Sequence, residues 1–167
     1  MNIADTKQIL SAEDAKRKIR RMAFEVAERN AGCEDLIVAG VSGNGLVVAK
    51  NVIRELEQII SVSIQLLTIE IDKTNPLNVS VSGDIPFNNR TIIIADDVAN
   101  SGKVLLYSLK PFLFHQPLSI QTLVLVERSH KLFPIQTDYV GLSIATTLQE
   151  HIAVKTEGES VTGAWLY

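Results

Sequence analysis

The sequence has few of the features that mark secreted, metal-clustered or membrane proteins. Its single cysteine, Cys33, cannot form an internal disulfide, and nothing resembles a zinc cluster. No apolar run approaches the ~18 residues that suggest a membrane span. The first residues also lack the basic-then-apolar order of a signal peptide. We therefore expect a protein of the reducing cytoplasm with no membrane partner.

The sequence also lacks a strong excess of charge of either sign. The formal net charge is −3, which gives no general attraction to nucleic acid or to an anionic surface. Hydrophobic residues make up 46% and charged residues 21% of the chain, as is usual for a globular protein. With 167 residues, the chain is expected to form a single domain, 1–167, around one core.

One helix face is nevertheless basic. Apolar residues at helical spacing predict a helix from about residue 12 to residue 30. Its opposite face carries Lys16, Arg17, Lys18, Arg20 and Arg21. Such a patch can contact RNA phosphates, but acidic residues at positions 13, 14, 25 and 28 dilute it. We favour a solvated helix face and keep RNA binding as the alternative.

The most informative stretch runs from Arg90 to Lys103. An apolar run over 92–95 is typical of a buried parallel strand. It is followed by two carboxylates, Asp96 and Asp97, and by a small-residue loop, after which helical spacing predicts a helix over about 103–112. The loop consists of Val98, Ala99, Asn100, Ser101, Gly102 and Lys103. Ligands of open α/β sheets bind where strands end, so this loop suits a phosphate monoester and the carboxylates suit ribose hydroxyls. The alternative is a helix that the acidic pair merely caps.

A second strand, loop and helix precede this stretch. The pattern predicts a strand over 36–41 and a helix over about 46–60. The connecting loop is rich in glycine and contains Val41, Ser42, Gly43, Asn44 and Gly45. Glycines let backbone amides approach an oxyanion closely, although a tight strand-to-helix turn would use the same residues.

Two further strands are predicted over 63–71 and 119–127. Arg128 follows directly at the carboxyl end of the second strand. The segment 72–89 between the first of these and the central stretch is long for a plain connection, so we expect a lid or a hairpin. His115 and His151 have no partner at a recognisable spacing, and we interpret them as surface residues. The apolar residues of the tail, 157–167, need burial, and another subunit is the expected cover.

The central stretch resembles the phosphoribosyl-pyrophosphate (PRPP) binding motif of the type I phosphoribosyltransferases. That motif is an apolar strand, an acidic pair, three variable residues, Thr-Gly, one residue and Thr. Ser101 stands for the first Thr and Val104 for the last. The segments Glu127-Arg-Ser-His-Lys-Leu-Phe-Pro-Ile135 and Asp138-Tyr-Val-Gly141 are similar to the bifunctional pyrimidine-operon regulators and uracil phosphoribosyltransferases. The resemblance runs from about residue 12 to residue 154.

The resemblance implies an α/β fold with a mainly parallel central sheet of about five strands flanked by helices. A small hood would be formed partly by about 142–156, together with residues near the N-terminus. The implied reaction is transfer of 5-phosphoribosyl from PRPP to a nucleobase, with uracil the expected acceptor, as in pyrimidine salvage. Mg²⁺ would be carried mainly by PRPP, and the protein would be a homo-oligomer, most simply a dimer.

The resemblance also implies roles for residues. Asp96 and Asp97 would hold the ribose, residues 98–103 the 5′-phosphate, and residues 41–45 the pyrophosphate. Arg128 would lie near the base or a phosphate, the alternative being a surface turn. Lys73 would stabilise charge in the transition state, the alternative being a solvated loop lysine.

Two departures from the family pattern bear on activity. Relatives usually carry a basic side chain near Asn44, and the segment 72–89 contains only Lys73 as a cation. We therefore expect low turnover, or the alternative of a nucleotide-sensing, RNA-binding regulator of pyrimidine genes with little or none. A response-regulator-like receiver domain is a third candidate. It requires a phospho-acceptor Asp at the end of another strand, and no other predicted strand ends so cleanly.

Overall fold

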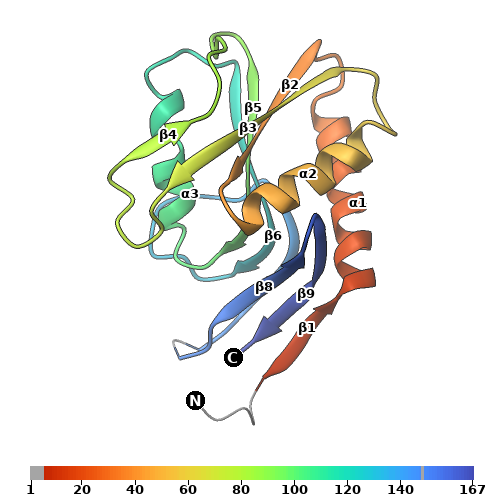
Figure 1. Ribbon diagram of the computed structural model, residues 1–167, viewed down its shortest axis with the longest axis vertical. Coiled ribbons are helices and arrows are strands. Elements are labelled where there is room, and N and C mark those ends of the chain that lie inside the picture. The colour runs from red at the N-terminus through yellow and green to blue at the C-terminus, as the bar shows by residue number, and fades with distance from the viewer. Residues whose placement is uncertain (1–5, 148) are drawn as a thin grey trace.

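The computed structural model describes residues 6–147 and 149–167, which form two sheets and their covering helices (Figure 1). The strands of the larger sheet are β2 (Asp35–Val41), β3 (Ser63–Ile71), β4 (Val79–Val81), β5 (Thr91–Ala99), β6 (Ser119–Arg128) and β7 (Tyr139–Ile144). They are ordered β4-β3-β2-β5-β6-β7, and all neighbours are parallel except β4, which runs antiparallel to β3. The five parallel strands match the expected number, and β4 adds a sixth at the edge.

The parallel strands are apolar on both faces because helices cover both. Leu36 and Val38 of β2 belong to one core cluster, and the alternating Ile37 and Ala39 belong to the other. The first cluster is closed by α1 (Ala12–Arg29) and α2 (Asn44–Leu56). The second is closed by α3 (Lys103–Ser108) and the short 3₁₀ helix η2 (Lys110–Phe112). The result is the predicted α/β fold.

Two predicted helices have different bounds in the structure. The helix expected over 103–112 ends at Ser108 and continues as η2, because Pro111 has no amide hydrogen to extend the α-helical pattern. The helix expected over 46–60 begins at Asn44, after the N-cap Gly43, and ends at Leu56. Within the described residues, none of the helices has both the length and the apolar character that crossing a membrane requires.

The long segment after β3 forms a hairpin. Val79–Val81 pairs with β3 in the register Ile69↔Val81 and Ile71↔Val79. A hairpin is therefore found, but it pairs β4 with the preceding strand β3, and residues 72–78 form its connecting loop. Lys73 lies in this connecting loop, two residues after the end of β3, at the carboxyl end of the parallel strands.

The second sheet is the hood, and its composition differs from the expectation. It contains β1 (Lys7–Ser11), β9 (Ser160–Leu166) and β8 (Ile152–Glu157), in that order and antiparallel. Of the expected segment 142–156, residues 142–144 belong to the main sheet and only 152–156 to the hood sheet, while residue 148 lies outside the described residues. The contribution from near the N-terminus is confirmed by β1.

The tail is the central strand of the hood. Because β9 pairs with both β1 and β8, it buries Val161 and Ala164 within the same chain. The hood thus covers part of the tail, but Trp165 and Leu166 are only half-buried and Tyr167 is 43% exposed, so cover by another subunit stays a prediction for the end of the tail.

The basic face of α1 is partly engaged in contacts. Arg17 pairs with Asp14, and Arg21 pairs with Glu25. Arg21 also donates to the carbonyl oxygens of Val140 and Gly141 at 2.8 and 3.0 Å. Two of the five cations thus have acidic partners, which supports the interpretation of a solvated helix face.

The position of β9 gives a stability prediction. Replacing the fully buried Ala164 with Asp places an unpaired charge in the core, so Ala164→Asp should lower the free energy of unfolding by about 3 kcal/mol or more. Urea denaturation measures this loss, and Ser160→Asp, an exposed site on the same strand, is the matched control. A loss that disappears on dilution would instead indicate that β9 is buried by a second subunit.

Candidate ligand-binding site

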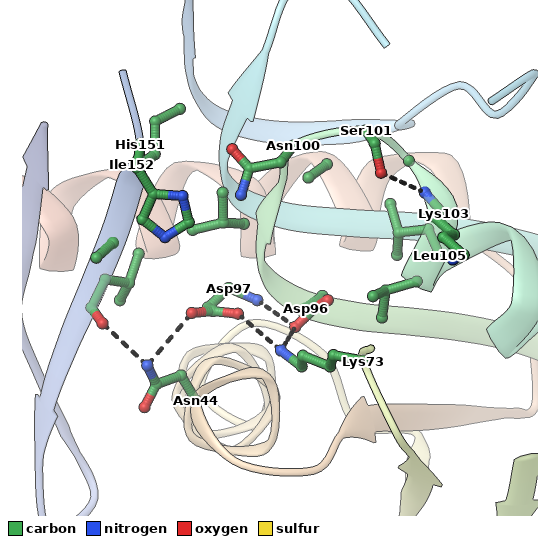
Figure 2. Close-up of a pocket in the computed structure, with 16 residues that line it drawn as sticks. Asn44, Lys73, Asp96, Asp97, Asn100, Ser101, Lys103, Leu105, His151 and Ile152 are labelled. Atoms are coloured by element: carbon green, nitrogen blue, oxygen red, sulfur yellow. Dashed lines mark hydrogen bonds and ion pairs between the residues drawn. The ribbon is translucent and has the colours of Figure 1, made fainter. Parts of the chain in front are cut away.

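A cleft of about 400 Å³ lies at the carboxyl end of the main sheet, between β5 and the hood (Figure 2). At this point the strand order reverses, because β3 and β5 flank β2 on opposite sides. Open α/β sheets bind ligands at such a switch point. The cleft is lined by Asn44, Lys73, residues 96–105 and residues 151–154.

The acidic pair lies inside β5 rather than beyond its end. The strand continues to Ala99 because pairing with β6 continues through Asp96↔Val124 and Val98↔Val126. Only 1% of Asp96 is exposed, and its Oδ1 accepts a hydrogen bond of 2.9 Å from the backbone amide of Asp97. The expectation that the strand ends before the carboxylates is therefore wrong, and the pair is more rigidly held than a loop would allow.

Gly45 explains how the acidic pair fits beneath α2. A Cβ atom at this position would lie 2.7 Å from Oδ1 of Asp96 and 3.1 Å from its Cα. The first turn of α2 can therefore approach β5 only because residue 45 has no side chain. Gly45 does not line the cleft, and its observed contact is with Asp96.

Lys73 joins the two carboxylates. Its Nζ lies 3.3 Å from Oδ1 of Asp96 and 3.5 Å from Oδ1 of Asp97 (Figure 2). Burial disfavours the charged ammonium, but the attraction of both carboxylates outweighs it and raises the pKa of Lys73 above its usual value. The ammonium stays charged between the two acids.

Asp96 has the most perturbed environment of the cleft. Burial disfavours its ionised form, and the neighbouring Asp97 carboxylate repels a second negative charge. Together they raise the pKa of Asp96 to about 8, against the opposing attraction of Lys73. At neutral pH the acidic pair therefore keeps one proton and carries a single negative charge, which faces the Lys73 ammonium.

Asn44 connects the acidic pair to the hood. Its Nδ2 donates to Oδ2 of Asp97 at 3.3 Å and to the carbonyl oxygen of Val154 at 2.9 Å. Its Oδ1 accepts a hydrogen bond of 2.9 Å from the hydroxyl of Thr156. Both hydrogen-bonding ends of the amide are thus engaged, and α2, β5 and β8 meet at this side chain.

The predicted loop 98–103 is shorter in the structure, because residues 98 and 99 end β5 and Lys103 begins α3. We keep the name Val98–Lys103 loop for the whole segment, which is held from behind by the residues after β6. The carbonyl oxygen of Ser101 accepts hydrogen bonds of 3.0 Å from the amides of Leu132 and Phe133. Gly102 has a φ of +82°, and a Cβ there would lie 2.6 Å from Ile135. The loop conformation therefore requires glycine at this position. It is fixed by these backbone contacts and by the Ser101 hydroxyl, which accepts a hydrogen bond of 3.2 Å from the Lys103 amide.

The structure brings most of the predicted site residues into one cleft, but not all. Asn44, Lys73, Asp96, Asp97 and residues 98–103 line it. Val41, Ser42, Gly43, Gly45 and Arg128 do not line it. Arg128 points instead to the segment before β8, where its Nη2 donates to the carbonyl oxygen of Glu150 at 2.6 Å.

Sequence reasoning missed the hood wall of the cleft. His151 is exposed, as expected of a surface residue, but it faces the cleft opposite Asn100 (Figure 2). Ile152, Ala153 and Val154 complete this wall. No local signal marks these residues, because β8 reaches the acidic pair through its pairing with β9 and its hydrogen bonds to Asn44, which join segments distant in sequence.

Comparison with known proteins agrees with this geometry. Residues 5–157 match the model of the phosphoribosyl transferase domain. The chain belongs to the type I phosphoribosyltransferase family. It is 36% identical over 159 residues to the bifunctional protein PyrR of Roseiflexus sp., covering 89% of this chain and 87% of that protein. PyrR of Clostridium novyi is 34% identical over 159 residues, covering 89% of each.

Solved structures of phosphoribosyltransferases share the fold. The hypoxanthine phosphoribosyltransferase of Trypanosoma cruzi has a TM-score of 0.77 at 16% identity, covering 94% of this chain and 95% of that one. A hypoxanthine-guanine phosphoribosyltransferase of Bacillus anthracis has a TM-score of 0.71 at 21% identity, covering 86% and 84%. At these identities the likeness concerns the fold alone. Membership of the phosphoribosyltransferase family removes the receiver-domain alternative.

The raised pKa of Asp96 gives a pH prediction for this phosphoribosyltransferase. Between pH 4 and pH 8 the folded protein keeps a proton that the unfolded chain has released, so this residue makes stability fall as pH rises through that window. Asp96→Asn removes the effect. The Tm of the variant relative to wild type should rise by a few degrees between pH 5 and pH 8.5.

The control for this measurement is Asp84→Asn, at an exposed carboxylate outside the cleft. Its Tm difference from wild type should stay constant with pH. Parallel pH profiles of wild type and Asp96→Asn would contradict the assignment of a proton to Asp96.

Proposed function

We propose that this protein transfers the 5-phosphoribosyl group of PRPP to a nucleobase and releases pyrophosphate, with uracil as the acceptor. The observation that carries the proposal is the position of the acidic pair. Asp96 and Asp97 share one cleft with the Val98–Lys103 loop and lie at the switch point of a sheet of the phosphoribosyltransferase family. The choice of uracil rests on the resemblance of the 127–141 region to the pyrimidine-operon regulators and on the PyrR relatives.

The layout of the cleft suggests where each part of PRPP binds. The Val98–Lys103 loop would take the 5′-phosphate, with the Ser101 hydroxyl and the Lys103 ammonium as donors. The acidic pair would accept hydrogen bonds from the ribose hydroxyls. Pyrophosphate would lie between Lys73 and the start of α2, and the base would lie towards the hood wall near His151 and the end of β6.

In the proposed reaction the bond between C1′ of the ribose and the pyrophosphate oxygen breaks, and its electron pair leaves with pyrophosphate. The base nitrogen forms the new bond to C1′ and releases its proton. Positive charge develops on the ribose and negative charge on the leaving group. The protein contributes mainly by aligning the reactants and neutralising the leaving group.

The residues of the cleft fit a Mg²⁺ ion that arrives with its substrate. Among residues 6–147 and 149–167, no group of three or more His, Cys, Asp and Glu side chains stands close enough together to hold a metal. Mg²⁺ prefers phosphate and water oxygens to a closed protein cage. Bound to PRPP, it would neutralise part of the charge on pyrophosphate, while Lys73 would meet the rest.

We propose that turnover is slow. Among the described residues that line the cleft, Lys73 and Lys103 are the two with permanent cationic side chains, and Lys103 belongs to the phosphate loop. Asn44 is uncharged and its amide is already engaged. Cations that strengthen their contacts as the leaving group departs raise the rate, whereas holding the substrate mainly lowers KM. The small number of cationic side chains in the cleft also favours the second candidate, a sensor that binds nucleotides without turnover.

Ligand binding tests the site assignment. Ribose 5-phosphate and UMP should both bind, and Asp97→Asn should weaken both by roughly tenfold, because an amide cannot replace a carboxylate that accepts from hydroxyls. Calorimetric titration measures the affinities, with Asp84→Asn as the control. Unchanged affinity in Asp97→Asn would remove the acidic pair from the binding site.

Turnover distinguishes the two candidates. With PRPP and Mg²⁺, uracil should yield UMP and pyrophosphate, while hypoxanthine, guanine and xanthine should react less. We expect a kcat about 10²-fold below that of relatives with a cation near position 44. Nucleotide binding with no product from any of the four bases would favour the sensor. A purine preference would refute uracil as the acceptor.

A further inference from the structure

Three of the four carboxyl oxygens of the acidic pair, which would receive the ribose hydroxyls, already have partners. Oδ1 of Asp96 faces the Lys73 ammonium and the Asp97 amide. Oδ1 of Asp97 also faces Lys73, and its Oδ2 accepts from Asn44. The Asp97 amide and Asn44 each contact one carboxyl group, whereas the Lys73 ammonium contacts both. A ribose that binds here competes with Lys73.

Lys73 is the contact that can give way. Asn44 is fixed at both ends of its amide by β8 and by Asp97. The Lys73 side chain, in contrast, is 44% exposed and reaches the acids on a flexible four-carbon stem. Its backbone is held by the neighbouring turn, in which Asp72 accepts from the amide and hydroxyl of Thr74 at 2.8 and 2.7 Å. The ammonium can therefore swing while its anchor stays in place.

We propose that Lys73 determines which ligand the cleft prefers. Its ammonium occupies the position of the ribose hydroxyls until a ligand brings an anion that replaces Asp96 and Asp97 as its partner. This inference rests on the proposed function, because it uses PRPP as the substrate. PRPP carries pyrophosphate on C1′, next to the hydroxyls that displace Lys73. Ribose 5-phosphate has no anion at that position.

The two ligands therefore differ in whether they supply an anion that can pair with the displaced Lys73 ammonium. Ribose 5-phosphate displaces the Lys73 ammonium from Asp96 and Asp97 and offers it no other anion. The affinity of the protein for ribose 5-phosphate is therefore reduced by the cost of separating a half-buried ion pair. PRPP supplies oxygens that pair with the ammonium again. The ion pair thus penalises ligands without pyrophosphate and spares the substrate.

The same exchange acts after transfer. Once pyrophosphate has left, the Lys73 ammonium loses its anion while the product ribose still covers the acidic pair. When the Lys73 ammonium returns to Asp96 and Asp97, it competes with the hydroxyls of the product and favours release of the nucleotide. Lys73 then serves binding of the substrate and departure of the product through one pair of contacts.

The test measures the affinities of ribose 5-phosphate and PRPP, both with Mg²⁺, for wild type, Lys73→Met and Lys73→Arg by calorimetry. Lys73→Met should bind ribose 5-phosphate about fivefold more tightly and PRPP about fivefold more weakly. Lys73→Arg keeps the charge and should retain the wild-type preference for PRPP. Lys16→Met, an exposed lysine that does not line the cleft, should change neither affinity.

Equal changes for the two ligands in Lys73→Met would overturn the inference, since Lys73 would then not discriminate between them. If both ligands still bind wild type and both are weakened by Asp97→Asn, the proposed function survives that result. Failure of wild type to bind either ligand would overturn the proposed function and the inference together.

Discussion

The site depends on one buried carboxyl group. Asp96 lies within β5, is 1% exposed, and packs against the first turn of α2 at a distance that only glycine at position 45 permits. This arrangement takes a polar group out of water and is stable because the group is protonated or paired. Burial thus sets the protonation of Asp96, draws Lys73 inward and fixes where Asp97 can accept. The remaining contacts of the cleft are arranged around these constraints.

Much of the architecture follows from local pattern. The continuous apolar strands predict a parallel sheet covered on both faces, and the two glycine loops mark the ends of β2 and β5, where the cleft is found. The acidic pair and residues 98–103 could therefore be placed together from sequence. What could not be predicted is the contribution of chain segments that are distant in sequence. The hood wall, the bonds of Asn44 to β8 and the role of the tail arise from strand pairing, which no short pattern encodes.

The errors have physical causes as well. Propensity predicts a turn after Ala95 because adjacent aspartates are poor strand formers, yet pairing with β6 carries β5 past them. Arg128 ends a strand beside residues 98–103, but its guanidinium turns to the backbone of Glu150. A strand end gives the location of a side chain, whereas its direction depends on the polar groups that surround it.

The pairing of β1 with β9 has a consequence for the order of folding. Lys7 lies opposite Leu166, so the hood joins segments separated by most of the chain. Closing such a long loop costs entropy that is recovered only when the strands meet, and contacts of this kind form slowly. During synthesis, the main sheet can assemble while residues 7–11 have no partner, and the hood follows only when residues 160–166 have emerged. The nascent chain would therefore lack the hood wall of the cleft, residues 151–154, and the cleft would be completed last.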